Sequence, residues 1–180
     1  MSKLNLNDLL HKKMAIIVMR LVGNGNLISI IPGRNVWPVD ADEKDVEQVI
    51  LNIAVKARQE ISRGGQLIIA TENVKLKHDN EQNAPRTAFD SYVNISFSYD
   101  INGGNKESMD NDISSAPTTH QTKIYEIVKR FNGYMNIHLN AEKSVTFNIL
   151  IPAYKNKQLP RRKTSGDISA TTAVKRWSRK

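Results

Sequence analysis

The chain has 180 residues, of which 39% are hydrophobic, 24% charged and 6% aromatic. This composition is typical of a globular protein, and the length suits one domain with a single core. No apolar run approaches the about 18 residues that a membrane-spanning helix needs, and the N-terminus lacks the apolar stretch of a secretory signal. We therefore expect a cytoplasmic protein without membrane insertion.

Two kinds of chemistry are excluded by residue usage. The chain has no cysteine, so it has no disulfide, thiolate metal ligand or cysteine nucleophile. The four histidines are scattered, without HExxH or a similar ligand spacing: they are His11, His78, His120 and His138. We predict no metal site and assign no catalytic residue.

The positive charge is concentrated at the C-terminus. The formal net charge is +8, yet residues 1–154 hold 17 basic and 17 acidic side chains, while residues 155–180 hold nine basic ones and a single Asp. The basic segment is too polar to offset the entropy lost on folding. We predict a folded domain over 1–154 and a disordered tail over 155–180. The tail is interpreted as a solvated appendage, with weak contact to nucleic acid or anionic lipid as the alternative.

The first 40 residues predict a helix followed by extended segments. Apolar residues recur at helical spacing from Leu9 to Leu21, and Gly23-Asn24-Gly25 ends the helix. Residues 26–32 predict a strand and residues 36–39 a second, short extended segment.

A longer helix and a strand come next. Asp42 is suited to be an N-cap, and acidic residues occupy the first turn that follows it. Apolar residues spaced by three and four continue from Val46 to Ile61, and Arg63-Gly64-Gly65 ends the helix. Residues 66–74 then predict a strand.

A further strand is predicted over residues 92–99, between two polar loops. The loops span residues 76–91 and 100–119, and neither shows apolar periodicity. We expect both loops to be poorly ordered.

The last elements are a helix and a hairpin. Apolar spacing from Ile124 to Phe131 predicts a helix that Asn132-Gly133 closes. Residues 134–139 and 144–151 predict an antiparallel pair of strands. The order of elements indicates an α+β fold, a two-layer sandwich of helices on one face of a mixed sheet.

Two stretches of the chain carry a resemblance to a known family. The first consists of Trp37–Asp42, Glu47–Arg58 and Gly64–Ile69, and the second of Tyr125–Tyr134 and Val145–Pro152. The first is similar to the N-box helix region, and the second to the last helix and closing hairpin, of the ATP-binding catalytic domain of bacterial sensor histidine kinases, in the GHKL superfamily. The resemblance covers residues 5–153 and is strongest to hybrid kinases. It implies the histidine-kinase-like ATPase fold and a nucleotide site.

The N-box helix of this family presents an asparagine, within the pattern Asn-x-x-x-Asn, whose side-chain carbonyl helps to hold Mg²⁺ beside the phosphates. Here Asn52 is present, but the second position is Lys56. An ammonium group has donors only and cannot ligate a metal that requires oxygen ligands. We interpret Lys56 as a solvated lysine beside a lost metal site, with direct phosphate contact as the alternative.

The family's first glycine box needs an aspartate for the adenine amino group, followed by glycines. Without a gap, Tyr99 falls at the aspartate position; with a shift of one residue, Asp100 does. Gly103 and Gly104 follow as candidate nucleotide contacts. The alternative interpretation is that this segment is only a turn after the strand.

The second glycine box is expected before the last helix, at Ala116–His120, and it contains no glycine. Proline removes one N–H donor there, and the β-branched Thr118 and Thr119 resist the φ > 0 conformations that glycine permits. One of these threonines would cap the helix. Only residues 105–115 remain for the ATP lid, so we expect the lid to be effectively missing.

The resemblance also implies a phosphoacceptor hairpin and, in hybrid kinases, a receiver domain. His11 is followed by two lysines and lies in a helix of the ATPase domain, so we interpret it as a surface histidine. We expect this chain to lack both the hairpin and the receiver.

Three functions are consistent with the sequence. The first is a degenerate histidine-kinase ATPase domain in two-component signalling that binds a kinase hairpin or a response-regulator receiver, with Asn52, Lys56, Asp100, Gly103, Gly104, Thr118 and Thr119 as a vestigial nucleotide site. It requires no cofactor. The second is an active domain that uses ATP and Mg²⁺ to phosphorylate a histidine of another chain. The third is a histidine phosphotransfer protein, which the missing hairpin disfavours.

Overall fold

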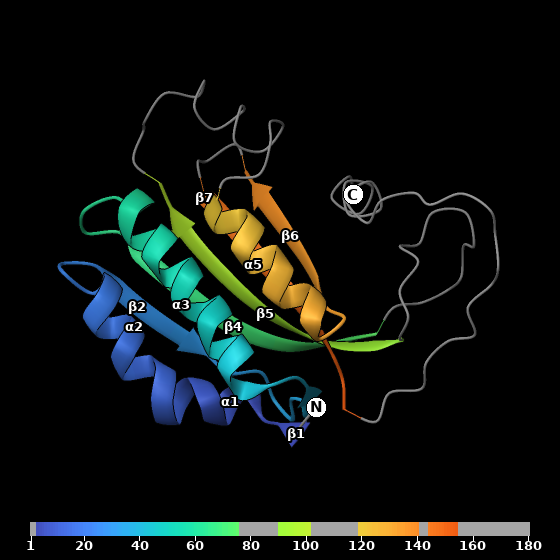
Figure 1. Ribbon diagram of the computed structural model, residues 1–180. Helices are drawn as coiled ribbons and strands as arrows, with labels where there is room; N and C mark the ends of the chain where they lie inside the picture. Colours follow the sequence, from blue (N-terminus) through green and yellow to red (C-terminus); the bar gives the residue numbers. More distant parts are fainter. Residues whose placement is uncertain (1–2, 76–89, 102–118, 141–143, 155–180) are drawn as a thin grey trace.

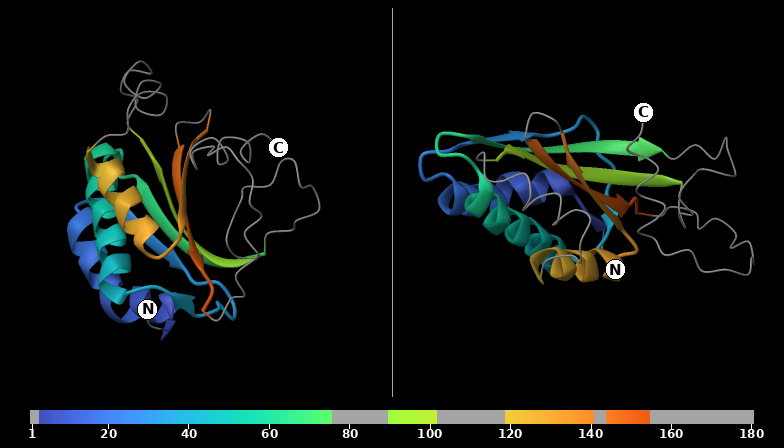
Figure 2. Two further views of the ribbon diagram at one scale, coloured as in Figure 1. Left: turned by 45° about the vertical axis from the view of Figure 1, so that its right-hand side comes forward. Right: turned by 90° about the horizontal axis from the view of Figure 1, so that it is seen from above.

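The computed structural model describes residues 3–75, 90–101, 119–140 and 144–154 (Figure 1). These residues form a mixed sheet with helices over one face, in two layers that Figure 2 shows from the side. The elements in chain order are β1 (Lys3–Leu4), α1 (Leu6–Leu9), η1 (Leu10–Met14), α2 (Ala15–Val22), β2 (Leu27–Ile31), β3 (Val39–Asp40), α3 (Glu43–Glu60), β4 (Gln66–Lys75), β5 (Ser91–Asp100), α5 (Thr119–Arg130), β6 (Tyr134–Leu139) and β7 (Ser144–Pro152).

The larger sheet has five described strands in the order β2-β4-β5-β7-β6. β2 and β4 are parallel, and the other neighbours are antiparallel. This arrangement confirms the predicted α+β sandwich with a mixed sheet. A separate two-stranded pair, β1 with β3, was not predicted from the sequence.

The N-terminal helical segment is longer than predicted and not uniform. Its first turn begins at Leu6, where the side chain of Asn5 accepts hydrogen bonds from two backbone N–H groups, and it passes through the π-helical turn η1 before α2. Gly23 closes it, because the Gly23 N–H donates to the carbonyl of Met19. Capping by a polar side chain explains why the helix starts before the apolar periodicity does.

Helix α3 follows the predicted pattern at its start and ends earlier than expected. The carboxylate of Asp42 accepts a hydrogen bond from the Lys44 N–H at 2.8 Å, as its N-cap role requires. The helix ends at Glu60, before the predicted Arg63-Gly64-Gly65 stop, because Ile61 adopts extended backbone and forms a bridge to Ile101. Tertiary pairing with the end of β5 therefore sets this boundary.

The core lies between α3 and the helix-facing side of the sheet. Alternate residues are buried there from Leu67 to Thr71 in β4, from Val93 to Tyr99 in β5 and from Val145 to Ile151 in β7, as a pleated strand requires. The α3 residues that complete this core are Val46, Val49, Ile50, Ile53, Ala54 and Ala57.

The other predicted elements were found with small shifts. The extended segment expected over 36–39 forms a strand only at Val39–Asp40. After α5, Asn132 rather than glycine takes the left-handed conformation, with φ 54°. Gly133 is needed for space, because a Cβ there would lie 2.7 Å from the carbonyl oxygen of Leu150.

Several predictions fall outside the described residues. They concern most of the two polar loops (residues 76–89 and 102–118) and the tail (155–180). Within the described part of the chain, no helix combines the length and apolarity that crossing a membrane would take.

Candidate functional site

The C-terminal half of α3 places three polar side chains on one face of the helix. Asn52, Lys56 and Glu60 follow one another at intervals of four residues, which brings them into line along the axis. The adjacent face carries Ile53 and Ala57, which are buried. The candidate site therefore lies along the border of the core.

Lys56 is held in an ion pair. Its ammonium group donates to a carboxylate oxygen, Oε1, of Glu60, and the two side chains are only 12% and 27% exposed. Our expectation of a solvated lysine is therefore wrong. Because a half-buried ammonium group is costly to desolvate without a counter-ion, the carboxylate one turn further along α3 is what makes this position tolerable.

Tyr99 joins the same pair from β5. Its hydroxyl donates to the other carboxylate oxygen, Oε2, of Glu60 at 2.7 Å, and its ring stacks on Phe147 with 6.3 Å between the centroids. Burial, and then the negative charge of Glu60, raise the pKa of the Tyr99 phenol far above its ordinary value. Tyr99 is therefore a neutral hydrogen-bond donor at any physiological pH.

Asn52 carries an unsatisfied polar atom. Its amide nitrogen Nδ2 is buried and has no hydrogen-bond partner among the residues that the structure describes. A buried donor without a partner costs about 1–3 kcal/mol, so such atoms point to a missing acceptor. Asn52 is one turn from Lys56, and the two donors lie on the same helix face.

Tyr99 and Asp100, the two alternatives for the adenine aspartate, lie on opposite faces of β5. Tyr99 belongs to the buried, helix-facing set, whereas Asp100 is exposed at the end of the strand. The Asp100 backbone carbonyl accepts from the Ser62 N–H at 3.3 Å. Its carboxylate makes no hydrogen bond or ion pair with the residues that the structure describes. The structure thus brings Tyr99, and not the Asp100 side chain, to Lys56.

The remaining predicted residues cannot be placed around this group. Gly103, Gly104 and Thr118 lie outside the described residues, and Thr119 is described only as the first residue of α5. Their roles stay predictions. His11 is exposed on η1.

Glu60 is the residue that sequence reasoning missed. The available signal was its spacing of four residues from Lys56 within a predicted helix, which places opposite charges side by side. Its contact with Tyr99 joins residues 39 positions apart and depends on the packing of α3 over β5.

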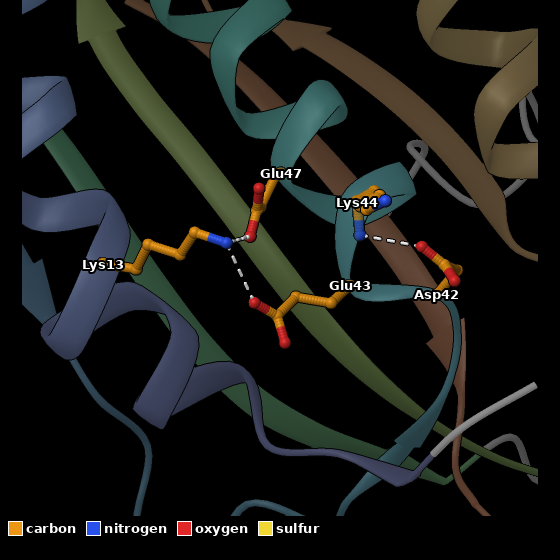
Figure 3. Close-up of polar contacts among 5 residues, drawn as sticks. All are labelled: Lys13, Asp42, Glu43, Lys44 and Glu47. Carbon is orange, nitrogen blue, oxygen red and sulfur yellow. Dashed lines mark hydrogen bonds and ion pairs between the residues drawn. The ribbon is translucent and has the colours of Figure 1, made fainter.

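The N-terminal end of α3 is joined to its neighbours by partly exposed ion pairs. The Lys13 ammonium group donates to the carboxylates of Glu43, at 3.1 Å, and of Glu47 (Figure 3). This raises the pKa of Lys13 and, through the same hydrogen bond, lowers the pKa of Glu43. Arg130 of α5 pairs with Asp45 at 3.0 Å. These contacts connect α3 to η1 and to α5.

Comparison with known proteins identifies the fold. No protein-family model matches the sequence. The sensor kinase CckA of Brucella abortus is 27% identical over 158 residues, which cover 83% of this chain but only 17% of CckA. The catalytic domain of histidine kinase ThkA superposes with a TM-score of 0.62 at 18% identity, over 84% of this chain and 95% of that domain.

A second solved structure supports the same assignment. The mycobacterial sensor histidine kinase MprB superposes with a TM-score of 0.58 at 10% identity, over 88% of this chain and all of the MprB chain. The described residues therefore have the fold of histidine kinase catalytic domains.

Proposed function

We propose that this chain is a histidine-kinase-type ATPase domain of a two-component signalling protein that has lost magnesium-dependent nucleotide chemistry and acts by binding another protein. The observation that supports this most is the Lys56–Glu60–Tyr99 group, which takes up the polar face of the N-box helix. The fold and the similarity to CckA support the signalling context.

The side chains present do not fit Mg²⁺. The ion requires oxygen ligands at about 2.0–2.1 Å in near-octahedral geometry. Lys56 offers no oxygen, and each oxygen of Glu60 already accepts a hydrogen bond, one from Lys56 and one from Tyr99. The amide oxygen of Asn52 alone cannot hold the ion against water. We therefore derive no phosphoryl-transfer step.

The ion pair between Lys56 and Glu60 changes the electrostatic reason why Mg²⁺ does not fit this site. From the sequence, an unopposed Lys56 would repel a divalent cation. In the structure, Glu60 neutralises that charge, so the obstacle is that the carboxylate is already engaged. A Mg²⁺ ion on Glu60 would compete with Lys56 and Tyr99 for the carboxylate and would bring a second positive group beside the sheltered Lys56 ammonium.

Protein binding is the role that such a domain can keep. A domain of this fold meets the phosphoacceptor hairpin of a kinase and the receiver domain of a response regulator, and we propose these as the partners. The basic tail over 155–180 would add weak attraction to anionic surfaces.

Isothermal titration of the full chain with ATP and Mg²⁺ tests the proposal. We expect no saturable heat, meaning a Kd weaker than about 1 mM. A histidine kinase catalytic domain that keeps Asn-x-x-x-Asn in its N-box is the positive control. A micromolar Kd would contradict the proposal and favour the active kinase, which phosphorylation of a separate kinase hairpin would then establish.

A further inference from the structure

Exposed apolar residues gather at one edge of the molecule. Within the described residues, the large apolar side chains with high exposure all lie in α2 and β2: Ile16 (59%), Ile17 (39%), Met19 (50%), Leu27 (67%) and Ile31 (55%). Single exposed apolar residues are ordinary on a protein surface, whereas five that gather on two consecutive elements point to a contact surface. We call these two elements the α2–β2 edge (Figure 1).

Helix α2 is apolar on both of its sides. Val18 and Val22 are buried against the domain, while Ile16 and Met19 point outwards. Arg20 is the only charged residue in the helix. A helix that is apolar all round is normally covered on all sides. The outer side of α2 therefore has the composition of a contact surface.

β2 ends the described sheet and leaves a backbone edge open. Its described neighbour is β4, and the Leu27 N–H donates to the carbonyl of Gly65 on that side. Because backbone groups alternate along a strand, those of Ile28 and Ile30 face the open side. β2 contains no charge, proline or bulge, which are the features that usually protect an edge from pairing.

The exposed side chains lie on both faces of this edge. Leu27 and Ile31 are in register with Gln66 and Ala70 of β4, whose side chains alternate with the buried, helix-facing Leu67. They therefore lie on the face away from the helices, whereas α2 lies on the helix side (Figure 2). A strand added beside β2 would place its alternate side chains against each of these apolar surfaces.

Three exposed arginines around the α2–β2 edge indicate the charge of the partner. Arg20 lies on α2, Arg63 in the turn that is bonded to the start of β2, and Arg34 three residues after its end. All three are exposed, and none forms an ion pair within the described part of the chain. Acidic groups at both ends of a bound segment would pair with them. A second copy would instead bring like charges together.

We propose that the α2–β2 edge binds an extended segment of a partner protein, apolar in its centre and acidic at both ends, which adds a strand to the sheet beside β2. Main-chain hydrogen bonds to Ile28 and Ile30 provide the pairing, and the arginines provide specificity. This inference is independent of the nucleotide site, which lies along α3.

Synthetic peptides test the proposal with the full chain. The probe has five alternating Val and Thr residues flanked by Asp-Glu pairs, and the matched control has Lys-Lys pairs at the same positions. In fluorescence anisotropy at low salt, we expect saturable binding of the acidic peptide and at least about tenfold weaker binding of the basic one, because charge steers and stabilises the contact. Hydrogen exchange should slow at the Ile28 and Ile30 amides when the acidic peptide binds.

Two sets of variants separate the parts of the inference. The first set reverses the charge of the three arginines in one triple variant, Arg20→Glu, Arg34→Glu and Arg63→Glu. We expect this variant to bind the basic peptide more tightly than the acidic one. The second set is the double variant Ile16→Ser with Met19→Ser. We expect it to lower the affinity for both peptides by the same factor. All five positions are exposed, so circular dichroism and thermal melting should match the wild type.

Three results would overturn the inference. They are binding of neither peptide, equal binding of both, and binding that the arginine reversal leaves unchanged. Sedimentation of the chain without peptide gives a separate check, for which we expect a monomer. A concentration-dependent dimer that Met19→Ser abolishes would assign the edge to a second copy instead.

Discussion

The two ends of helix α3 use the same kinds of charged residue to different effect. At the N-terminal end, Lys13 is 48% and Glu43 50% exposed, so water and salt screen their attraction, although Glu47 is only 18% exposed. At the C-terminal end, Lys56 and Glu60 are sheltered and tied to Tyr99. The exposure of the lysine, rather than the number of ion pairs, therefore decides which end is sensitive to the loss of one partner.

The largest effect is expected from Glu60→Ala. This change leaves the Lys56 ammonium group and the Tyr99 hydroxyl without their shared acceptor in a half-buried site. We expect the free energy of unfolding to fall by about 2 kcal/mol, less than for a fully buried pair because water reaches part of Glu60. Urea denaturation followed by circular dichroism measures it.

A double variant distinguishes the loss of the ion pair from the loss of packing. Lys56→Met combined with Glu60→Leu removes both charges and keeps apolar volume, so it should recover most of the stability that Glu60→Ala loses. If the double variant is as unstable as the single one, the ion pair is not the cause and the comparison between the two ends fails.

A smaller effect is expected from Tyr99→Phe. The variant keeps the ring beside Phe147 and removes one hydrogen bond to a charged acceptor. We expect the free energy of unfolding to fall by about 1 kcal/mol at pH 7. Because folding raises the pKa of Tyr99, its contribution is fully present below the ordinary tyrosine pKa and is lost as the pH rises above it.

The pH dependence provides the control for Tyr99. Between pH 7 and 11 the wild type should lose stability more steeply than Tyr99→Phe, since the unfolded chain releases a proton that the folded site retains. Parallel stability curves for the two proteins over this range would contradict the assignment of Tyr99 as a protonated donor.

The smallest effect is expected from Lys13→Met at the exposed end. Folding lowers the pKa of Glu43, so its contribution is present above the ordinary glutamate pKa and is lost as the pH falls through the folded value. The melting temperature should therefore drop slightly at pH 7 in low salt. The drop should shrink in 0.5 M NaCl, about a 4 Å screening length, and at pH 3. A drop as large as that of Glu60→Ala, or one insensitive to salt, would show that the two ends do not differ.

The elements that local patterns specify were predicted well. The apolar spacing and the Asp42 cap located α3, and strand alternation located β4, β5 and β7. The pairing of β1 with β3 could not be predicted, because each has only two residues and the pair is formed by distant contacts. The end of α3 was misplaced for a similar reason, since Ile61 leaves the helix to pair with Ile101.

The candidate site was only partly accessible to sequence reasoning. Asn52 and Lys56 were found through the resemblance of residues 47–58 to the N-box helix. The choice between Tyr99 and Asp100 stayed open, because it depends on which face of β5 points toward α3. The structure places Tyr99 on that face and identifies Glu60 as the group that joins it to Lys56.

The amino-acid sequence by itself determined most of the helix and strand pattern, the concentration of positive charge in residues 155–180, and the four-residue spacing of Asn52 and Lys56. These properties depend on neighbours along the chain, through periodicity, capping and composition. Only the tertiary structure decided that Lys56 is neutralised, that Tyr99 is a buried donor and that α2 and β2 share one apolar edge. Solvation and pairing depend on residues that are distant in the chain and adjacent in space, so they are set when the layers pack.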